Sequence, residues 1–305
     1  MKSTRNKTID FSLEQAGEYL NKVVKNSDIK KVEPSVTVNG DAFLVLEKIA
    51  DKSVDLVIVD PPYNLDKDFH GNGFKKCKSD EYAEYTESWI KAIKSKLKDT
   101  ASIYVCCDWK SALVIGGIID KHFILRNRIT WQREKGRGAK SNWKNSMEDI
   151  FYATVSDDYC FNLQAVKQRK KVLAPYKTEG VPKDWSETPD GKYRDTCPSN
   201  FWDDIAVPYW SMAENTAHPT QKPEKLIAKL ILASSNKNDL VLDPFAGSST
   251  TGVVAYKLGR KYVCIEQNPL YCAWAQKRME TAKTDKSIQG YEDGVFWERN
   301  SRPKK

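Results

Sequence analysis

The chain has 305 residues, 40% of them hydrophobic, which is enough to bury the core of one large α/β domain with an insertion. No apolar run approaches the roughly 20 residues that cross a bilayer, and the start of the chain has no apolar segment typical of a secretory signal. We therefore expect no membrane association, and a net charge of +8 favours an anionic partner.

The seven cysteines follow no metal-binding or disulfide pattern, and the chain has only three histidines. None of the cysteines forms a Cys-x-x-Cys pair, so a zinc site would need unusual ligands. Unpatterned thiols without an export signal are typical of the reducing cytoplasm. We expect a cytoplasmic protein without a metal, in which the cysteines have structural or incidental roles.

Strands alternate with amphipathic helices in the first half of the chain. After a weakly helical stretch at 12–24, the expected elements are a strand at 35–38, a helix at 42–50, a strand at 54–59, a helix at 82–97 and a strand at 102–107. In the helix at 82–97, Tyr82, Tyr85 and Trp89 recur on one face. Such alternation is typical of a parallel sheet covered by helices.

The same alternation starts again in the second half. Its expected elements are a helix at 224–235, a strand at 239–243, a tight turn at 245–252, a helix at 250–259, a strand at 261–266 and a helix from 270. Between the halves, at about 133–220, periodicity is lost and Lys, Arg, Trp, Gly and Pro are frequent. A long irregular segment in a compact domain is usually functional or disordered, and the aromatic residues argue against disorder.

The turn DPFAGSSTTG, residues 243–252, predicts a ligand site at a strand-to-helix junction. Its small residues let the backbone approach a ligand, and the free amides of the helix N-terminus face that ligand. Glu266, at the end of the next strand, is placed to accept hydrogen bonds from ribose hydroxyls. A nucleoside ligand is our interpretation, and an ordinary tight turn is the alternative. The motif is neither a Walker A loop nor Gly-x-Gly-x-x-Gly.

The motif DPPY, residues 60–63, predicts an acceptor-rich corner at the end of a strand. An ionised Asp60 offers only acceptors, and the two prolines add carbonyls while lacking the N–H groups that would compete. Tyr63 adds a flat face on which a planar ring can stack. The corner therefore suits the exocyclic amino group of an aromatic base, with a proline-terminated strand and a buried tyrosine as the alternative.

Together these motifs resemble the S-adenosylmethionine-dependent DNA amino-methyltransferases in their β-group order, in which the catalytic motif precedes the cofactor motif. The resemblance covers about residues 35–282. Its further motifs are Gly40-Asp41, ITWQREKGRG (129–138), Glu148 in MEDIFYAT, NFWDDI (200–205) and HPTQKPEKL (218–226). It implies a Rossmann-like α/β fold with a mostly parallel twisted sheet, helices on both faces, a circularly permuted motif order and an inserted target-recognition region.

The resemblance also implies a role for each matching residue. Asp60 and the carbonyl of Pro61 would hold the target amino group, Pro62 would stiffen the corner, and Tyr63 would stack on the extruded base. The residues implied for S-adenosylmethionine binding are Asp41, Asp60, Pro61, His218, Thr220, Gln221, Lys222, Asp243, Phe245, Ala246, Gly247, Ser248, Ser249, Thr250 and Glu266. The family more often has a second glycine where this chain has Ser249.

The implied reaction is a direct transfer of a methyl group. Acceptors on both amino protons would expose the nitrogen lone pair, so no covalent enzyme intermediate is needed. The base must first leave the duplex, at a cost of a few kcal/mol that stacking on Tyr63 partly offsets. Within the family, a tetrapeptide that begins with Asp is found mainly in enzymes that methylate N6 of adenine. We therefore expect this amino group to be the methyl acceptor. The alternatives are N4 of cytosine, an adenine in RNA, and a non-catalytic nucleic-acid-binding subunit; a nucleotide-dependent oxidoreductase would leave DPPY unexplained.

The irregular region is expected to contact double-stranded DNA. Its candidate phosphate contacts are Arg133, Lys135, Arg137, Lys140, Lys144, Lys167, Arg169, Lys170 and Lys171. The expected division of the chain is an N-terminal extension (1–34), a catalytic half (35–132), a target-recognition insertion (133–217), a cofactor-binding half (218–282) and a basic C-terminal tail (283–305). The family resemblance further suggests a cognate restriction nuclease and a homodimer as partners.

Overall fold

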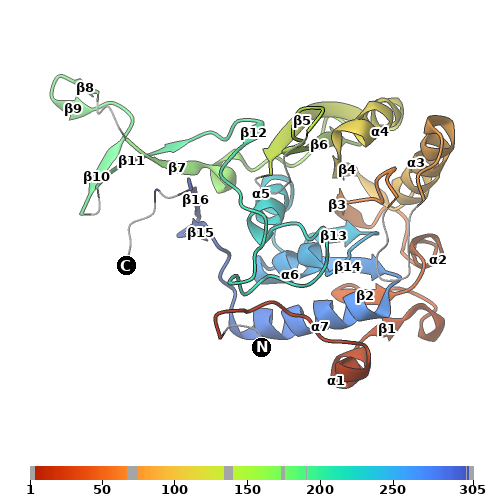
Figure 1. Ribbon diagram of the computed structural model, residues 1–305. Coiled ribbons are helices and arrows are strands. Elements are labelled where there is room, and N and C mark those ends of the chain that lie inside the picture. The colour runs from red at the N-terminus through yellow and green to blue at the C-terminus, as the bar shows by residue number, and fades with distance from the viewer. Residues whose placement is uncertain are drawn as a thin grey trace.

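The protein was analysed as a computed structural model, which describes residues 4–66, 75–133, 140–172, 176–189, 191–299 and 301. Its largest unit is a nine-stranded sheet (Figure 1). The strands of this sheet are β1 (Val24–Lys25), β2 (Val36–Asn39), β3 (Val54–Val59), β4 (Leu97–Cys107), β5 (Ile124–Gln132), β6 (Met147–Thr154), β12 (Phe201–Trp202), β13 (Leu240–Asp243) and β14 (Lys261–Glu266).

Seven α-helices and three short 3-10 helices accompany the strands in the described residues. The α-helices are α1 (Gly17–Leu20), α2 (Ala42–Leu46), α3 (Ser79–Lys94), α4 (Trp109–His122), α5 (Glu224–Ser234), α6 (Thr250–Lys257) and α7 (Pro269–Thr284). The 3-10 helices are η1 (Glu14–Ala16), η2 (Asn26–Asp28) and η3 (Leu163–Val166).

The strand order β1-β2-β14-β13-β3-β4-β6-β5-β12 brings the two halves of the chain together at the centre of the sheet. There β13 pairs with β3 in parallel, with Val241 opposite Leu56. The strands from β1 to β4 are all parallel, whereas β6 runs antiparallel to both of its neighbours. The carboxyl ends of β3, β13 and β14 therefore lie side by side at one edge.

Each face of the sheet has its own hydrophobic core. On one face, Leu56 and Ile58 of β3 pack in the same cluster as side chains of α5 and α6. On the other, Val57 and Val59 pack with side chains of α3 and α4. This alternation explains the continuous apolar run of a strand that is buried on both sides. The expected α/β fold, with a mostly parallel sheet and helices on both faces, is confirmed.

Besides the two-residue edge strands β1 and β12, the elements of the main sheet region that were not expected from the sequence are α4, β5 and β6. The helix α4 contains Gly116 and Gly117 among β-branched residues, a composition that weakens a helical pattern. Gly116 is required by packing, since a Cβ at this position would lie 2.7 Å from the ring of Phe151 on β6. The strand β6 lies within the segment 133–217 that was expected to form the insertion. Part of that segment therefore belongs to the main sheet, where β6 pairs with β4 and β5.

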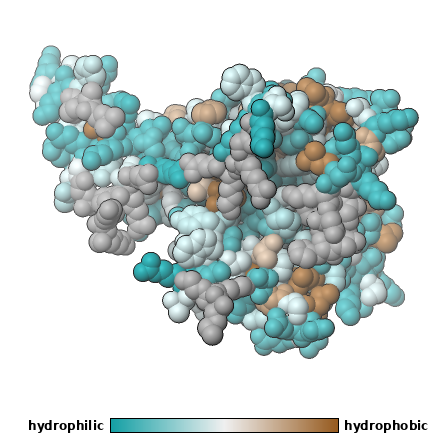
Figure 2. All heavy atoms as spheres, in the orientation of Figure 1, coloured by the Kyte–Doolittle hydropathy of each residue, from teal (hydrophilic) through white to brown (hydrophobic). Residues whose placement is uncertain are grey.

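A second sheet extends away from the main body and is seen at the upper left of Figure 1. In the order β10-β11-β7-β16-β15, its strands are Ser186–Thr188, Gly191–Thr196, Gln168–Lys171, Val295–Trp297 and Tyr291–Glu292. A hairpin of β8 (Lys177–Thr178) and β9 (Val181–Pro182) lies beyond it. Figure 2 shows that this peripheral sheet has a mainly hydrophilic surface.

Both ends of the chain are built into these sheets. Near the C-terminus β16 pairs in parallel with β7, so residues 291–297 complete the peripheral sheet rather than forming a separate tail. At the N-terminal end β1 pairs with β2, and the indole of Trp274 donates to the carbonyl of Phe11. Within the described ranges, no helix is long and apolar enough to cross a membrane, and no three potential ligands converge on a metal site.

Candidate active site

A cavity of about 420 Å³ opens at the carboxyl edge of β3, β13 and β14. Parallel α/β sheets bind ligands at this edge, because the loops that follow the strands meet there. The motifs at 60–63, 218–222 and 243–251, which are far apart in sequence, all line this one cavity. Its volume falls in the range of about 300–1,000 Å³ that is usual for small-molecule sites.

Glu266, the last residue of β14, is held in a fixed orientation by the backbone. Its two carboxylate oxygens accept hydrogen bonds from the amides of Asn268 (2.7 Å) and Gly247 (2.9 Å). Each oxygen has further acceptor capacity for hydroxyl groups in the cavity. Burial raises the pKa of Glu266 to about 7, although the two amide hydrogen bonds oppose this shift.

The glycine turn is formed by close packing against the HPTQKP segment. Gly247 has a φ of +53°, and a Cβ there would lie 2.8 Å from Nε2 of His218. Asp243 ties the turn together, accepting from the amide of Phe245 (3.1 Å) and from the hydroxyl of Thr251 (2.6 Å). Burial raises the pKa of Asp243 to about 7. The turn therefore brings its backbone close to the cavity at Gly247.

The opposite side of the cavity is the DPPY corner. The hydroxyl of Tyr63 donates to Oδ1 of Asp60 at 2.7 Å, and Nζ of Lys222 donates to Oδ2 at 2.6 Å. The hydroxyl of Tyr82 donates to the carbonyl of Pro62 at 3.0 Å, which anchors the corner to α3. Burial, together with the charge of Asp60, raises the pKa of Tyr63, so its hydroxyl remains a donor.

Lys222 lies between two carboxylates. Its Nζ is 3.3 Å from Oε2 of Glu148, and Glu148 also forms an ion pair with Arg133. Burial lowers the pKa of Lys222, but the charges of Asp60 and Glu148 outweigh this effect and raise it above the ordinary value. Lys222 is therefore a permanent cation beside the acceptor corner.

Nearly all of the residues expected to bind the cofactor line this cavity, including Asp41, Thr220, Gln221, Ala246, Ser248 and Thr250. Ser249 is the exception. It is completely buried, has a φ of +56°, and turns its hydroxyl to Oγ1 of Thr37 at 3.3 Å. Ser249, where the family more often has glycine, thus has a left-handed backbone conformation and does not line the cavity.

The expected phosphate contacts lie in different environments. Arg133 lines the cavity and pairs with Glu148, so it is part of the buried charge network. Lys140, Lys144 and Lys171 are exposed, and Lys167 is half-buried. On the peripheral sheet Arg169 and Lys170 have acidic partners, Asp195 and Glu298. Lys135 and Arg137 lie outside the described residues.

Glu148 is a site residue whose position the sequence did not reveal. Because β6 runs antiparallel, its first residues lie at the edge where the parallel strands end. Glu148 is only 3% exposed there and lines the cavity. In the sequence, Glu148 is recognisable only as an acidic residue at the start of an apolar run. Whether it reaches the site depends on the direction in which that strand runs in the sheet.

Comparisons with known proteins agree with this geometry. A family model described as DNA methylase matches residues 54–277. The DNA adenine methyltransferase YhdJ of Escherichia coli is 36% identical over 253 residues, which cover 82% of this chain and 84% of that protein. The Type II methyltransferase M.HpaI of Haemophilus parainfluenzae is 31% identical over 245 residues, covering 79% of this chain and 73% of its own.

Solved structures give the same fold. The PvuII DNA methyltransferase (cytosine-N4-specific) superposes with a TM-score of 0.61 at 21% identity, over 83% of this chain and 92% of the other. A crystal structure of an M1.HpyAVI–SAM complex gives a TM-score of 0.52 at 20% identity, over 80% and 98%. With the family model spanning most of the sheet and the Escherichia coli relative aligned over most of its length, the chain belongs to the DNA methylase family.

Proposed function

We propose that this enzyme transfers a methyl group from S-adenosylmethionine to the N6 amino group of an adenine that has been extruded from duplex DNA. The observation that carries the proposal is that one cavity combines an acceptor corner, Asp60 to Tyr63, with a nucleoside-binding edge at Glu266 and Gly247. The first suits an amino group on a base, and the second suits the ribose of a cofactor.

The residues of the cofactor side fit S-adenosylmethionine. The carboxylate of Glu266 is oriented by two amides and is left able to accept from ribose hydroxyls. Phe245 offers an aromatic surface in the cavity, its ring held edge-to-face by Trp89 at 6.2 Å between centroids. When bound, S-adenosylmethionine supplies an electrophilic methyl group. A solved relative of the same fold is described as a SAM complex, which supports this choice.

The acceptor corner orients the substrate amino group. Asp60 and the carbonyl of Pro61 accept its two protons, which directs the nitrogen lone pair away from the ring and toward the donor methyl. The ring of Tyr63 stacks on the base, a contact worth on the order of 1–3 kcal/mol. The proton released from nitrogen after transfer leaves through the acceptor corner to water.

Adenine is the favoured base for two reasons. The tetrapeptide has Asp at its first position, and the relative YhdJ, which is 36% identical, is named a DNA adenine methyltransferase. The PvuII enzyme shares the fold and is cytosine-N4-specific, so the fold alone does not select the base. Residues 140–146 beside the cavity, together with the peripheral sheet, are our candidates for DNA contact and target recognition.

The test is to express the chain in a bacterial host that lacks DNA methyltransferases and to analyse nucleosides by mass spectrometry. N6-methyldeoxyadenosine in DNA, absent with an Asp60→Ala variant, would support the proposal. Sequencing of modified bases would then identify the recognition site. N4-methylcytosine as the sole product would overturn the choice of base, and methylation confined to RNA would overturn the substrate.

A further inference from the structure

Lys222 was expected to line the cofactor pocket, but its ammonium group is turned to the acceptor corner. Three oxygens surround Nζ: Oδ2 of Asp60 at 2.6 Å, the hydroxyl of Tyr63 at 3.2 Å and Oε2 of Glu148 at 3.3 Å. Nζ donates hydrogen bonds to the first two of these oxygens, and the third belongs to an ion-pair partner, so the ammonium group is engaged by the protein. The side chain of Lys222 is only 6% exposed.

The charge of the cofactor makes this placement informative. S-adenosylmethionine carries a positive sulfonium beside the methyl group that it donates, and a buried cation nearby would repel it. A lysine at this position is therefore unfavourable for the cofactor unless its charge is neutralised by acids of the protein. Asp60 and Glu148 provide that neutralisation, and Arg133 balances the second carboxylate.

We propose that Lys222 is a positioning residue for the acceptor corner, which holds the carboxylate of Asp60 in its orientation, while Glu148 keeps the lysine in place. This inference rests on the proposed methyl transfer and assigns Lys222 to the amino-group side of the reaction. An ionised carboxylate can accept from the substrate amino group with both oxygens, whereas a protonated one offers a competing donor.

The surroundings of Asp60 explain why a cation is needed. The charged and titratable groups around it are Lys222, Tyr63, Glu148, Cys106 and Asp243. Among these Lys222 is the sole cation in contact with Asp60 in the described part of the chain, whereas Glu148 and Asp243 are acids. Without Lys222, the carboxylate of Asp60 would lose this cationic partner and lie near two other carboxyl groups, whose charges would repel it from its present orientation.

Glu148 is a second carboxylate with which Lys222 can pair. Its Oε2 is buried and accepts no hydrogen bond from the described residues, although Nζ of Lys222 lies 3.3 Å away. As the substrate amino group takes up acceptor capacity on Asp60, Nζ can shift toward Glu148 without losing its neutralising charge. The pair of acids thus keeps Lys222 charged and nearby through the binding of the base.

The experiment compares Lys222→Met, Lys222→Arg and wild type under single-turnover conditions, with saturating isotope-labelled S-adenosylmethionine and unmethylated plasmid DNA, from pH 5.5 to 9.5. For Lys222→Met we expect a rate loss on the order of 10²-fold across this range, because the carboxylate of Asp60 loses the charged donor that orients it. Lys222→Arg should recover at least about tenfold, because it restores the charge.

Calorimetry and thermal melting distinguish this positioning role from a role in cofactor binding and from a role in stability alone. Lys222→Met should bind S-adenosylmethionine within about threefold of wild type, since the hydrogen bonds of Lys222 are made to the acceptor corner. Lys225→Met is the matched control, because Lys225 is also buried and also pairs with an aspartate, Asp204 at 2.6 Å, but lies outside the cavity. Lys225→Met should lower thermal stability and leave the single-turnover rate close to that of wild type.

An unchanged single-turnover rate in Lys222→Met would overturn the proposal. A loss confined to cofactor affinity would return Lys222 to the cofactor side and overturn it as well. If wild type itself forms no methylated base in DNA, the proposed function fails and not the role of Lys222, so the two failures are distinguishable.

Discussion

The two sheets of the molecule hold their charged side chains in opposite ways. At the edge of the main sheet, Lys222 and Glu148 are almost completely buried and share their partners. On the peripheral sheet, Arg169 pairs with Asp195 while both side chains remain about one-third exposed. Breaking a buried pair costs roughly 3–5 kcal/mol, whereas exposed pairs contribute about 0–1 kcal/mol. The first arrangement is suited to fixed geometry, and the second can exchange an acid for a phosphate.

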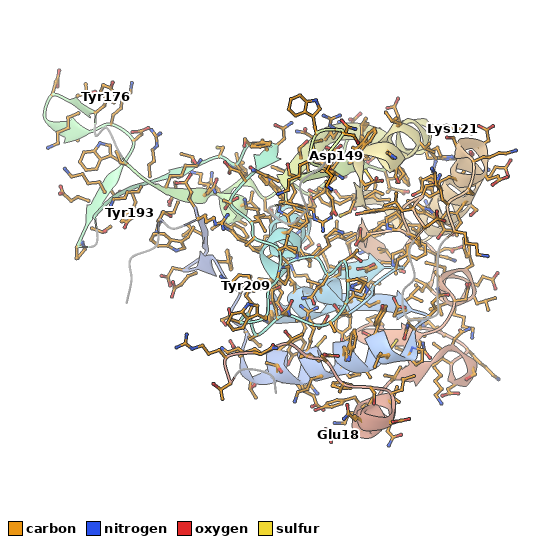
Figure 3. The ribbon with its side chains drawn as sticks, viewed as in Figure 1. Glu18, Lys121, Asp149, Tyr176, Tyr193 and Tyr209 are labelled. Carbon is orange, nitrogen blue, oxygen red and sulfur yellow. The ribbon has the colours of Figure 1, made fainter. Side chains whose placement is uncertain are left out.

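Figure 3 shows how differently the two regions are built. Asp149, labelled on β6, belongs to the densely packed body. Tyr193 on β11 and Tyr176 near β8 are carried on the thin extension. Tyr193 is supported by Trp297 of β16, with ring centroids 5.4 Å apart, whereas Tyr176 is 76% exposed. Four sets of substitutions test this contrast, and their expected effects decrease in the order given.

The largest effect is expected for Asp60→Ala, which removes the acceptor of the substrate amino group. The single-turnover rate of methyl transfer should fall on the order of 10³-fold. Asp55→Asn is the matched control, because Asp55 lies on β3, the strand that leads to Asp60, and pairs with Lys98 at 2.6 Å, but at the end away from the cavity. Comparable losses in both variants would contradict a special role for Asp60.

Glu266→Gln tests the cofactor side and predicts a pH dependence. Hydrogen bonds to a charged group contribute roughly 1.5–3 kcal/mol, so S-adenosylmethionine affinity should fall about tenfold or more. Since burial raises the pKa of Glu266 to about 7, the ionised acceptor is present above that pH and is lost below it. Calorimetry on wild type should therefore show affinity weakening as the pH falls through 7, by up to about tenfold per unit.

The Glu266→Gln variant should show a flatter pH dependence than wild type, because its amide does not titrate. Asp243, whose pKa burial also raises to about 7, lines the same cavity and accepts a hydrogen bond from the hydroxyl of Thr251. A pH dependence that survives unchanged in Glu266→Gln would assign the titration to Asp243.

Gly247→Ala probes the contact between the two cofactor motifs. A non-glycine residue in the left-handed region costs roughly 1–3 kcal/mol, and here the new Cβ would also collide with His218. Gly259→Ala shares the positive φ, at +74°, but has open space around it. Thermal melting should show loss in both, whereas reduced cofactor affinity is expected only for Gly247→Ala. Equal affinities would mean that the His218 contact is unimportant.

The smallest effect is expected on the peripheral sheet, for Lys170→Ala combined with Lys171→Ala. DNA affinity should fall several-fold, and the slope of log affinity against log salt should decrease by about 0.9 for each phosphate that the protein no longer neutralises. Lys31→Ala is the control, since Lys31 is exposed and pairs with Glu33 away from this sheet. If affinity and slope both stay constant, this stretch does not contact DNA.

The sequence by itself determined the elements whose pattern is local. Asp60-Pro61-Pro62-Tyr63 and Asp243 to Gly252 each follow an apolar strand directly, so both could be placed at strand ends without knowledge of the fold. The same holds for Glu266, which ends β14. Periodicity likewise predicted most helices, and failed at α4 because two glycines and β-branched residues obscure its pattern.

Only the tertiary structure decided which of these elements meet. Strand pairing joins β3 to β13 and β7 to β16 across long stretches of chain, and no local preference encodes such a choice. The partner of Lys222 is decided in the same way, because a buried ammonium selects its acceptors by position in space. Local chemistry thus revealed the acceptor corner, while packing brought the ammonium group of Lys222 into contact with it.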